Sequence, residues 1–188
     1  YSNCFNQELK FDTSKVTNMI SMFDYAKSFN QPLNFNTSNV TSMKEMFSYT
    51  EKFNQPLNFD TSKVTNMGAM FFKSINFNQE LNFDTSSVTN MEYMFANAKS
   101  FNRPLNFDIS NVTYMSKIFN GAEAFKDKYN NGNSLPYYTE DIKLWLEKNS
   151  EKMNIIDIKD THGKEIDDFF SKFTNINIEI NSIQRKEI

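Results

Sequence analysis

Apolar residues return along the chain at a fixed interval of 24 positions, with two different spacings inside each interval. Residues 33–35 read Leu-Asn-Phe, and this alternation predicts a short strand with Leu and Phe on one face. The segment 43–50 places Met, Met, Phe and Thr at i, i+3, i+4 and i+7, which predicts one buried stripe of a helix. The chain is therefore a tandem array, and each repeat is expected to contain one strand and one short helix.

The residues around these segments favour the same interpretation. Thr41 stands where a helix N-cap is expected, and residues 89–92 (Thr-Asn-Met-Glu) read as a capping box. Pro32 precedes the strand, where a missing N–H does little harm. A unit of 24 residues cannot bury enough apolar surface alone, so stacking is required. We expect an α/β repeat solenoid, a right-handed coil with a parallel strand ladder on one face and short helices on the other.

The repeats divide the chain into two parts. Residues 1–124 form five tandem 24-residue repeats, and residues 125–188 are expected to form a divergent last coil and a C-terminal α/β cap. In the cap, Thr139 is expected to start a helix that ends near Lys148. Residues 153–159 and 175–181 are predicted strands, and residues 165–173 a predicted helix. Because Tyr1 is in register with later repeat tyrosines, we expect the chain to be a fragment that begins inside a repeat.

Asparagine occupies two repeat positions that call for different explanations. One column follows the first Phe of each repeat and is expected to satisfy backbone groups of neighbouring coils; it comprises Asn6, Asn30, Asn54, Asn78 and Asn102. The other lies between Leu and Phe, where alternation turns it outward; it comprises Asn34, Asn58, Asn82 and Asn106. Its constancy is explained either by an asparagine ladder between stacked strands or by a polar surface that binds a repetitive ligand. These four residues are the candidate binding residues.

A column of acidic residues invites a metal-binding interpretation, which the spacing does not favour. It comprises Asp12, Asn36, Asp60, Asp84 and Asp108. Stacked carboxylates could hold Ca²⁺, but no second acidic column completes a coordination shell. Each of these residues precedes a turn, where Asp and Asn bond to their own backbone. We therefore predict turns and no metal site.

Charge and residue types exclude several functions. The net charge of −3 offers no basic field for nucleic acid. Cys4 is the only cysteine, so no intrachain disulfide can form, and no apolar run is long enough to span a bilayer. The single histidine, His162, is predicted to lie in an exposed turn with no nucleophile beside it. We expect no catalytic residues, no cofactor and no enzymatic activity.

The repeat motif resembles a known family. The pattern FNQPLNFDTSNVTxMxxMF, nearly verbatim at residues 29–47 and 53–71, is similar to the bacterial surface-protein repeat of mollicute and Listeria lipoproteins, related to BspA-like leucine-rich repeats. This resemblance covers residues 1–125. It implies a leucine-rich-repeat-like fold on a protein at the extracellular cell surface, anchored by lipid through a segment outside this chain. It carries no binding residue over to particular positions.

Two functions follow from these observations. The first is a non-enzymatic interaction or display module, active in adhesion or host contact through the exposed face, with a host or extracellular protein or a glycan as partner. The second is a structural spacer or antigenic repeat array with no specific ligand. Neither involves nucleic acid, and membrane contact is expected only through the anchor.

Overall fold

The computed structural model describes residues 3–154 and 156 of the chain. It divides into two units, Tyr1–Ser150 and Glu151–Ile188. The first unit contains all the repeats. The predicted elements at 165–173 and 175–181, and His162, lie outside the described residues.

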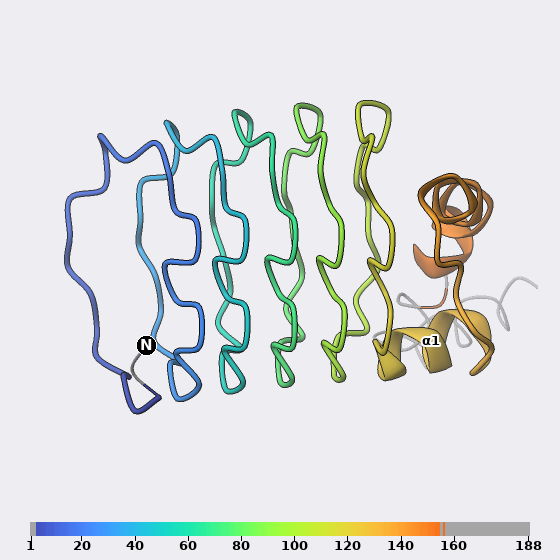
Figure 1. Ribbon diagram of the computed structural model, residues 1–188, viewed down its shortest axis with the longest axis horizontal. Coiled ribbons are helices and arrows are strands. Elements are labelled where there is room, and N and C mark those ends of the chain that lie inside the picture. Colours follow the sequence, from blue (N-terminus) through green and yellow to red (C-terminus); the bar gives the residue numbers. More distant parts are fainter. Residues whose placement is uncertain (1–2, 155, 157–188) are drawn as a thin grey trace, which may run out of the picture. The chain divides into compact units, whose positions relative to one another are not determined.

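The repeats form coils that lie side by side in chain order (Figure 1). Neighbouring coils are joined in register, because equivalent residues 24 positions apart pair with each other. The pairs are isolated parallel bridges, one residue from each coil: Asn18, Ser42, Asn66, Asn90 and Tyr114. Among the described residues, neighbouring coils therefore pair at isolated bridges and form no sheet.

One side of each coil is a run of tight turns, which we call the turn wall: residues 43–50 and their equivalents. Along this wall the backbone amides alternate between two kinds of acceptor. The N–H groups of Glu45 and Phe47 donate to Gly68 O and Met70 O in the next coil, both at 2.9 Å. The N–H groups between them close turns within the coil, as Ser48 does by donating to Glu45 O at 3.1 Å. Half of the amides thus connect coils.

The helix predicted for 43–50 is wrong, and these hydrogen bonds give the reason. A helix uses its own carbonyls as acceptors for successive amides, whereas alternate amides here bond to another coil. Glu45 and Tyr49 also have positive φ values of 58° and 53°, which a right-handed helix does not allow. Every second turn in this run has a left-handed third residue, and the run buries side chains at i, i+3, i+4 and i+7. The run therefore reproduces the apolar spacing of a helix: Met43, Met46, Phe47 and Thr50 are all buried.

The threonines expected to cap the repeat helices instead connect the coils. The Thr41 hydroxyl donates to Thr17 O at 3.1 Å, and the Thr65 hydroxyl donates to Thr41 O at 3.2 Å. In the predicted capping box, Glu92 accepts a hydrogen bond from the Ser116 hydroxyl of the next coil. The capping residues are therefore lateral links between coils.

The opposite side of each coil, residues 30–37 and their equivalents, is held differently, and we call it the amide wall. The burial pattern of the predicted strand is present, since Leu33 and Phe35 are buried and Asn34 is exposed. However, the described residues contain no strand and no sheet, and the backbone amides of residues 31–36 form no hydrogen bond with a neighbouring coil. The predicted α/β class and the parallel strand ladder are therefore wrong.

Side chains connect the coils along the amide wall instead of backbone pairs. At one end of this wall, Asn30 N–H donates to Asn6 Oδ1 at 2.9 Å. At the other end, the buried Thr37 hydroxyl donates to Asp60 O at 2.9 Å. At both ends of this segment, a side chain from one coil therefore satisfies a backbone group of the neighbouring coil.

Columns of phenylalanine fill the space between the walls. Phe47 is fully buried and stacks on Phe23 and Phe71 of the adjacent coils, with ring centroids 5.4 and 5.7 Å apart. It also stacks on Phe53 of the other column at 4.3 Å. Each ring thus packs against rings within its own coil and in both neighbours. This continuous aromatic core is the main apolar connection between repeats.

Two helices follow the last coil. Helix α1 spans Glu123–Asn130 and buries Phe125, which continues one phenylalanine column by stacking on Phe101 at 5.9 Å. A second helix spans 139–154 among the described residues, longer than predicted, and buries Ile142 and Leu146. Residues 153, 154 and 156, expected to begin a strand, are helical. The Thr139 hydroxyl accepts a hydrogen bond from Met115 N.

Candidate functional site

The predicted binding column lies on the surface of the amide wall. Asn34, Asn58, Asn82 and Asn106 are all exposed, one in each of four successive coils, and Lys10 holds the position in the first coil. In the described structure no hydrogen bond joins Asn34, Asn58 or Asn82 to any other residue. The asparagine ladder that could have explained this column is therefore absent at those three positions. Their amide groups face solvent with both donor and acceptor capacity unused.

The second asparagine column is structural, as predicted. Asn30 Oδ1 accepts the backbone N–H of Asn54 at 2.9 Å, and Asn54 Oδ1 accepts that of Asn78 at 2.9 Å. The Gln55 side chain adds a hydrogen bond to Asn30 O at 3.3 Å. These half-buried amides therefore have a complete role within the fold. The two asparagine columns are four residues apart in sequence. The side chains of one column form hydrogen bonds between coils, whereas those of Asn34, Asn58 and Asn82 in the other form none in the described structure.

The acidic column forms turns, as predicted. Asp60 Oδ1 accepts hydrogen bonds from Ser62 N–H at 3.1 Å and from the Ser62 hydroxyl at 2.7 Å. These bonds from the serine favour the ionised carboxylate and lower the pKa of Asp60. Asn36 makes the same contacts with Ser38 at 3.1 and 2.7 Å. Since an amide serves as well as a carboxylate, the position is occupied for turn geometry. No group of residues that could hold a metal ion occurs in the described part of the chain.

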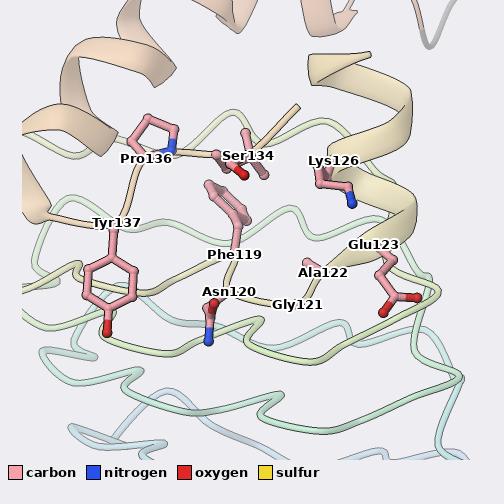
Figure 2. Close-up of a pocket in the computed structure, with 10 residues that line it drawn as sticks. Phe119, Asn120, Gly121, Ala122, Glu123, Lys126, Ser134, Pro136 and Tyr137 are labelled. Carbon is pink, nitrogen blue, oxygen red and sulfur yellow. The ribbon is translucent and has the colours of Figure 1, made fainter. Parts of the chain in front are cut away.

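A hollow of about 280 Å³ lies where the last coil leads into α1. Figure 2 shows its side chains, with Glu123 and Lys126 carried by the helix and Pro136 by the loop that follows it. Both charged groups are paired already: Glu123 with Lys99 at 3.7 Å and Lys126 with Asp127 at 3.8 Å. Its two charged side chains are therefore each already in an ion pair.

Sequence reasoning missed a second hollow, of about 380 Å³, on the turn wall. It lies over Ala69, and the side chains of Glu45 and Tyr93 from the two adjacent coils flank it. These three residues occupy one repeat position that drifts from coil to coil, whereas the fixed columns suggested the candidate site. The available signal was a small residue between two large ones in a variable column. We call this hollow the aromatic groove.

These observations define the chain as a repeat protein. Its coils stack in register and expose columns of polar side chains on the surface. The chain belongs to the family described as "Mycoplasma protein of unknown function, DUF285", which matches residues 1–59 and 57–139. This match agrees with the mollicute part of the sequence resemblance. It gives no support to a relation with BspA-like leucine-rich repeats, whose predicted fold the structure contradicts. No curated protein and no solved structure matches the chain.

The helices are unsuited to crossing a bilayer. Among the described residues, neither helix combines the length and the apolar composition that a membrane span requires.

Proposed function

We propose that this chain is a non-enzymatic interaction module of a bacterial surface protein, and that it binds an extended polar polymer along the amide wall. The observation that carries the proposal is the exposed column of Asn34, Asn58 and Asn82, which recurs in three successive coils without a hydrogen-bond partner in the described structure. A repeated amide fits a ligand with repeated hydroxyl or carbonyl groups, because each amide both donates and accepts.

A glycan is the first candidate for this ligand. Its hydroxyl groups match an amide in both hydrogen-bonding directions, and coils stacked in register present the amides as a regular row. Because the column is neutral, binding by these amides should depend little on salt. The backbone of an extended peptide is the other candidate, consistent with a host or extracellular protein as partner.

The proposed location rests on the family and the sequence resemblance. The chain belongs to a Mycoplasma family, and its motif resembles the repeats of mollicute lipoproteins. A cell-surface protein, anchored by lipid through a segment outside this chain, is consistent with both. The alternative is a spacer or antigenic array, in which the exposed amides contact only water.

Glycan and peptide arrays, probed with the wild-type chain and with an Asn58→Ala/Asn82→Ala variant, separate these possibilities. The matched control is Asn76→Ala, which removes another exposed asparagine whose side chain has no partner in the described structure. We expect binding that the double variant loses and the control keeps, with unchanged thermal unfolding for both. A wild-type chain that binds nothing on either array would support the spacer function instead.

A further inference from the structure

The last coil has two backbone donors that the segment after it does not use. In the preceding coil, four alternate N–H groups of the turn wall donate to the next coil: those of Met91, Tyr93, Phe95 and Asn97. The equivalent residues of the last coil are Met115, Lys117, Phe119 and Gly121. The first two are bonded to the segment that follows α1, but the N–H groups of Phe119 and Gly121 have no acceptor in the described structure.

The segment at residues 137–139, which we call the capping segment, runs in the opposite direction to the coils. Met115 N–H donates to the Thr139 hydroxyl at 3.0 Å, and Lys117 N–H donates to Tyr137 O at 2.8 Å. The donor two residues later in the coil thus finds an acceptor two residues earlier in the segment. The capping segment is therefore antiparallel to the last coil, whereas neighbouring coils pair in parallel. Acceptors for the remaining donors would have to come from the residues before Tyr137.

The residues before the capping segment bond elsewhere. The backbone carbonyls of Asn133 and Ser134 both accept hydrogen bonds from Asn130 Nδ2 at 3.1 Å, at the end of α1. The hollow of about 280 Å³ lies at this place, and Phe119, Gly121 and Ser134 are among its lining residues (Figure 2). We call it the end hollow. Both backbone donors without an acceptor therefore belong to residues that line it.

The two donors are held in the same conformation as their equivalents in the preceding coil. Gly121 has a φ of 73°, and Asn97 has a φ of 58°. The Ala122 N–H closes its turn on Phe119 O at 3.0 Å, the same distance as in the preceding coil. The N–H groups of Phe119 and Gly121 therefore point to where a next coil would lie. Donors fixed in this way lose little freedom when an acceptor binds.

A backbone donor without an acceptor is unfavourable where the protein surrounds it. Phe119 is 3% exposed, and its ring stacks on Phe95 and Phe125 with centroids 6.3 and 4.3 Å away. Buried backbone N–H groups are nearly always paired with protein or with water. The Phe119 amide therefore favours a ligand that supplies an acceptor.

The preceding coil shows which acceptors suit these donors. Phe95 N–H donates to Ile118 O at 3.0 Å, and Asn97 N–H donates to Asn120 O at 2.7 Å. The acceptors are peptide carbonyls two residues apart in one backbone. In an extended peptide the carbonyls of alternate residues also point to the same side. The pair of open donors therefore matches the edge of an extended peptide.

The charges of the end hollow favour a neutral acceptor over an anion. Glu123 and Lys126 line it with opposite charges, and each is already in an ion pair. A free carboxylate or phosphate would lie near Glu123, while Lys126 is held by Asp127. A peptide carbonyl accepts a hydrogen bond without bringing a net charge. It therefore meets the open donors without repulsion from the glutamate.

We propose that the end hollow binds an extended peptide segment of a partner protein, whose backbone carbonyls at two alternate residues accept the N–H groups of Phe119 and Gly121. The partner segment takes the place that a next coil would hold on this part of the turn wall. The site goes beyond the proposed function, because it shares no residue with the asparagine column. Binding at either place can therefore fail without the other.

The first test uses a peptide with the sequence of residues 116–121, acetylated and amidated at its ends, which carries the two carbonyls that the preceding coil binds. It is titrated into the full chain while the amide signals of Phe119 and Gly121 are followed by NMR. We expect saturable downfield shifts of both amide protons and slower exchange with solvent. No saturable shift at these amides would overturn the proposal, because the end hollow would then hold only water.

The matched control for this peptide has thioamides in place of the carbonyls of Ile118 and Asn120. A thioamide keeps the backbone neutral but is a weaker acceptor. We expect its affinity to be at least about fivefold lower, since two hydrogen bonds are weakened. Equal affinity for the two peptides would contradict recognition through the carbonyls.

A pair of variants provides the second test. Ser134→Phe adds a ring at an exposed position that lines the end hollow, and Asn133→Phe adds the same ring at an exposed neighbour that does not. We expect Ser134→Phe to weaken binding of the peptide at least about fivefold, because the ring fills the hollow. Asn133→Phe is expected to bind within about twofold of the wild-type chain. Undiminished binding by Ser134→Phe with unchanged thermal unfolding, or an equal loss in both variants, would contradict the location.

Discussion

Both walls of each coil bury apolar side chains, but different chemical groups connect them to the next coil. On the turn wall, alternate backbone amides donate to the next coil, as Phe47 does to Met70 O at 2.9 Å. On the amide wall, side chains make the connections, as Asn54 Oδ1 does to Asn78 N at 2.9 Å. A pattern of buried residues therefore does not indicate which groups form the hydrogen bonds. The amide wall should be sensitive to changes in side chains, and the turn wall to changes in the backbone.

The largest effect is expected from removing an aromatic ring from the amide wall. Phe59 is 7% exposed, and Phe59→Ala should lower the free energy of unfolding by about 3–5 kcal/mol, because it removes apolar burial and leaves a cavity. Phe11 holds the same repeat position in the first coil but is 59% exposed. Phe11→Ala should cost less than about 1 kcal/mol. Urea denaturation of both variants measures this difference, and equal losses would mean that position 59 is not packed as described.

A matched pair of prolines tests the backbone of the two walls. Glu45→Pro removes an N–H that bonds to Gly68 O and cannot adopt a φ of 58°, so it should cost at least about 3 kcal/mol. Glu80→Pro lies on the amide wall, where Pro56 and Pro104 stand at the same repeat position. This change should be neutral or stabilise by up to about 1 kcal/mol. If thermal melting shows Glu80→Pro to be as damaging as Glu45→Pro, the contrast between the walls is wrong.

The two asparagine columns should respond differently to alanine. Asn54→Ala leaves the backbone N–H of Asn78 without its acceptor and should cost about 1–2 kcal/mol. Asn58→Ala removes no hydrogen bond of the described structure and should change stability by less than about 0.5 kcal/mol. Asn54→Asp is the control, because a carboxylate oxygen can still accept from Asn78. Urea denaturation distinguishes the columns, and a substantial loss for Asn58→Ala would restore the ladder explanation.

The smallest effect concerns acid stability. The serine hydrogen bonds lower the pKa values of Asp60, Asp84 and Asp108 below 3.8 in the folded chain. Their contribution is therefore fully present above pH 3.8 and is lost as the pH falls towards the folded-state values. Replacing all three by Asn should leave the turns intact, since Asn36 forms the same turn. Below pH 3.8, we expect the melting temperature of this triple variant to fall slightly less steeply with decreasing pH than that of the wild-type chain. A steeper fall in the variant would show that the pKa values of these carboxyl groups are not lowered by folding.

The repeat period and the buried positions could be predicted from sequence, because both depend on side-chain chemistry alone. Leu33, Phe35, Met43 and Phe47 are buried as expected. The asparagine and aspartate turn contacts were also predictable, since these side chains bond over short and repeated distances. Each of these features follows from the spacing of particular residue types.

The backbone conformation was not predictable, because the spacing of apolar residues does not indicate which carbonyl groups accept the backbone N–H groups. A run of tight turns buries residues 43, 46, 47 and 50 as a helix would. The only available sign was the wide range of residues at the left-handed positions, which include Ser21, Glu45, Ala69, Tyr93 and Lys117. The aromatic groove was not predictable for a related reason: it depends on one small residue, Ala69, at a repeat position whose residue type varies between coils.

Residue-resolved amide hydrogen exchange tests most directly whether the two walls are connected by different groups. We predict slow exchange at Glu45, Phe47 and Tyr49, whose N–H groups donate to the next coil, and at Asn54, whose N–H is held by Asn30. We predict fast exchange at residues 33–35, which have no such acceptor in the described structure. Slow exchange at residues 33–35 in successive coils would reveal a strand ladder and refute the difference between the walls.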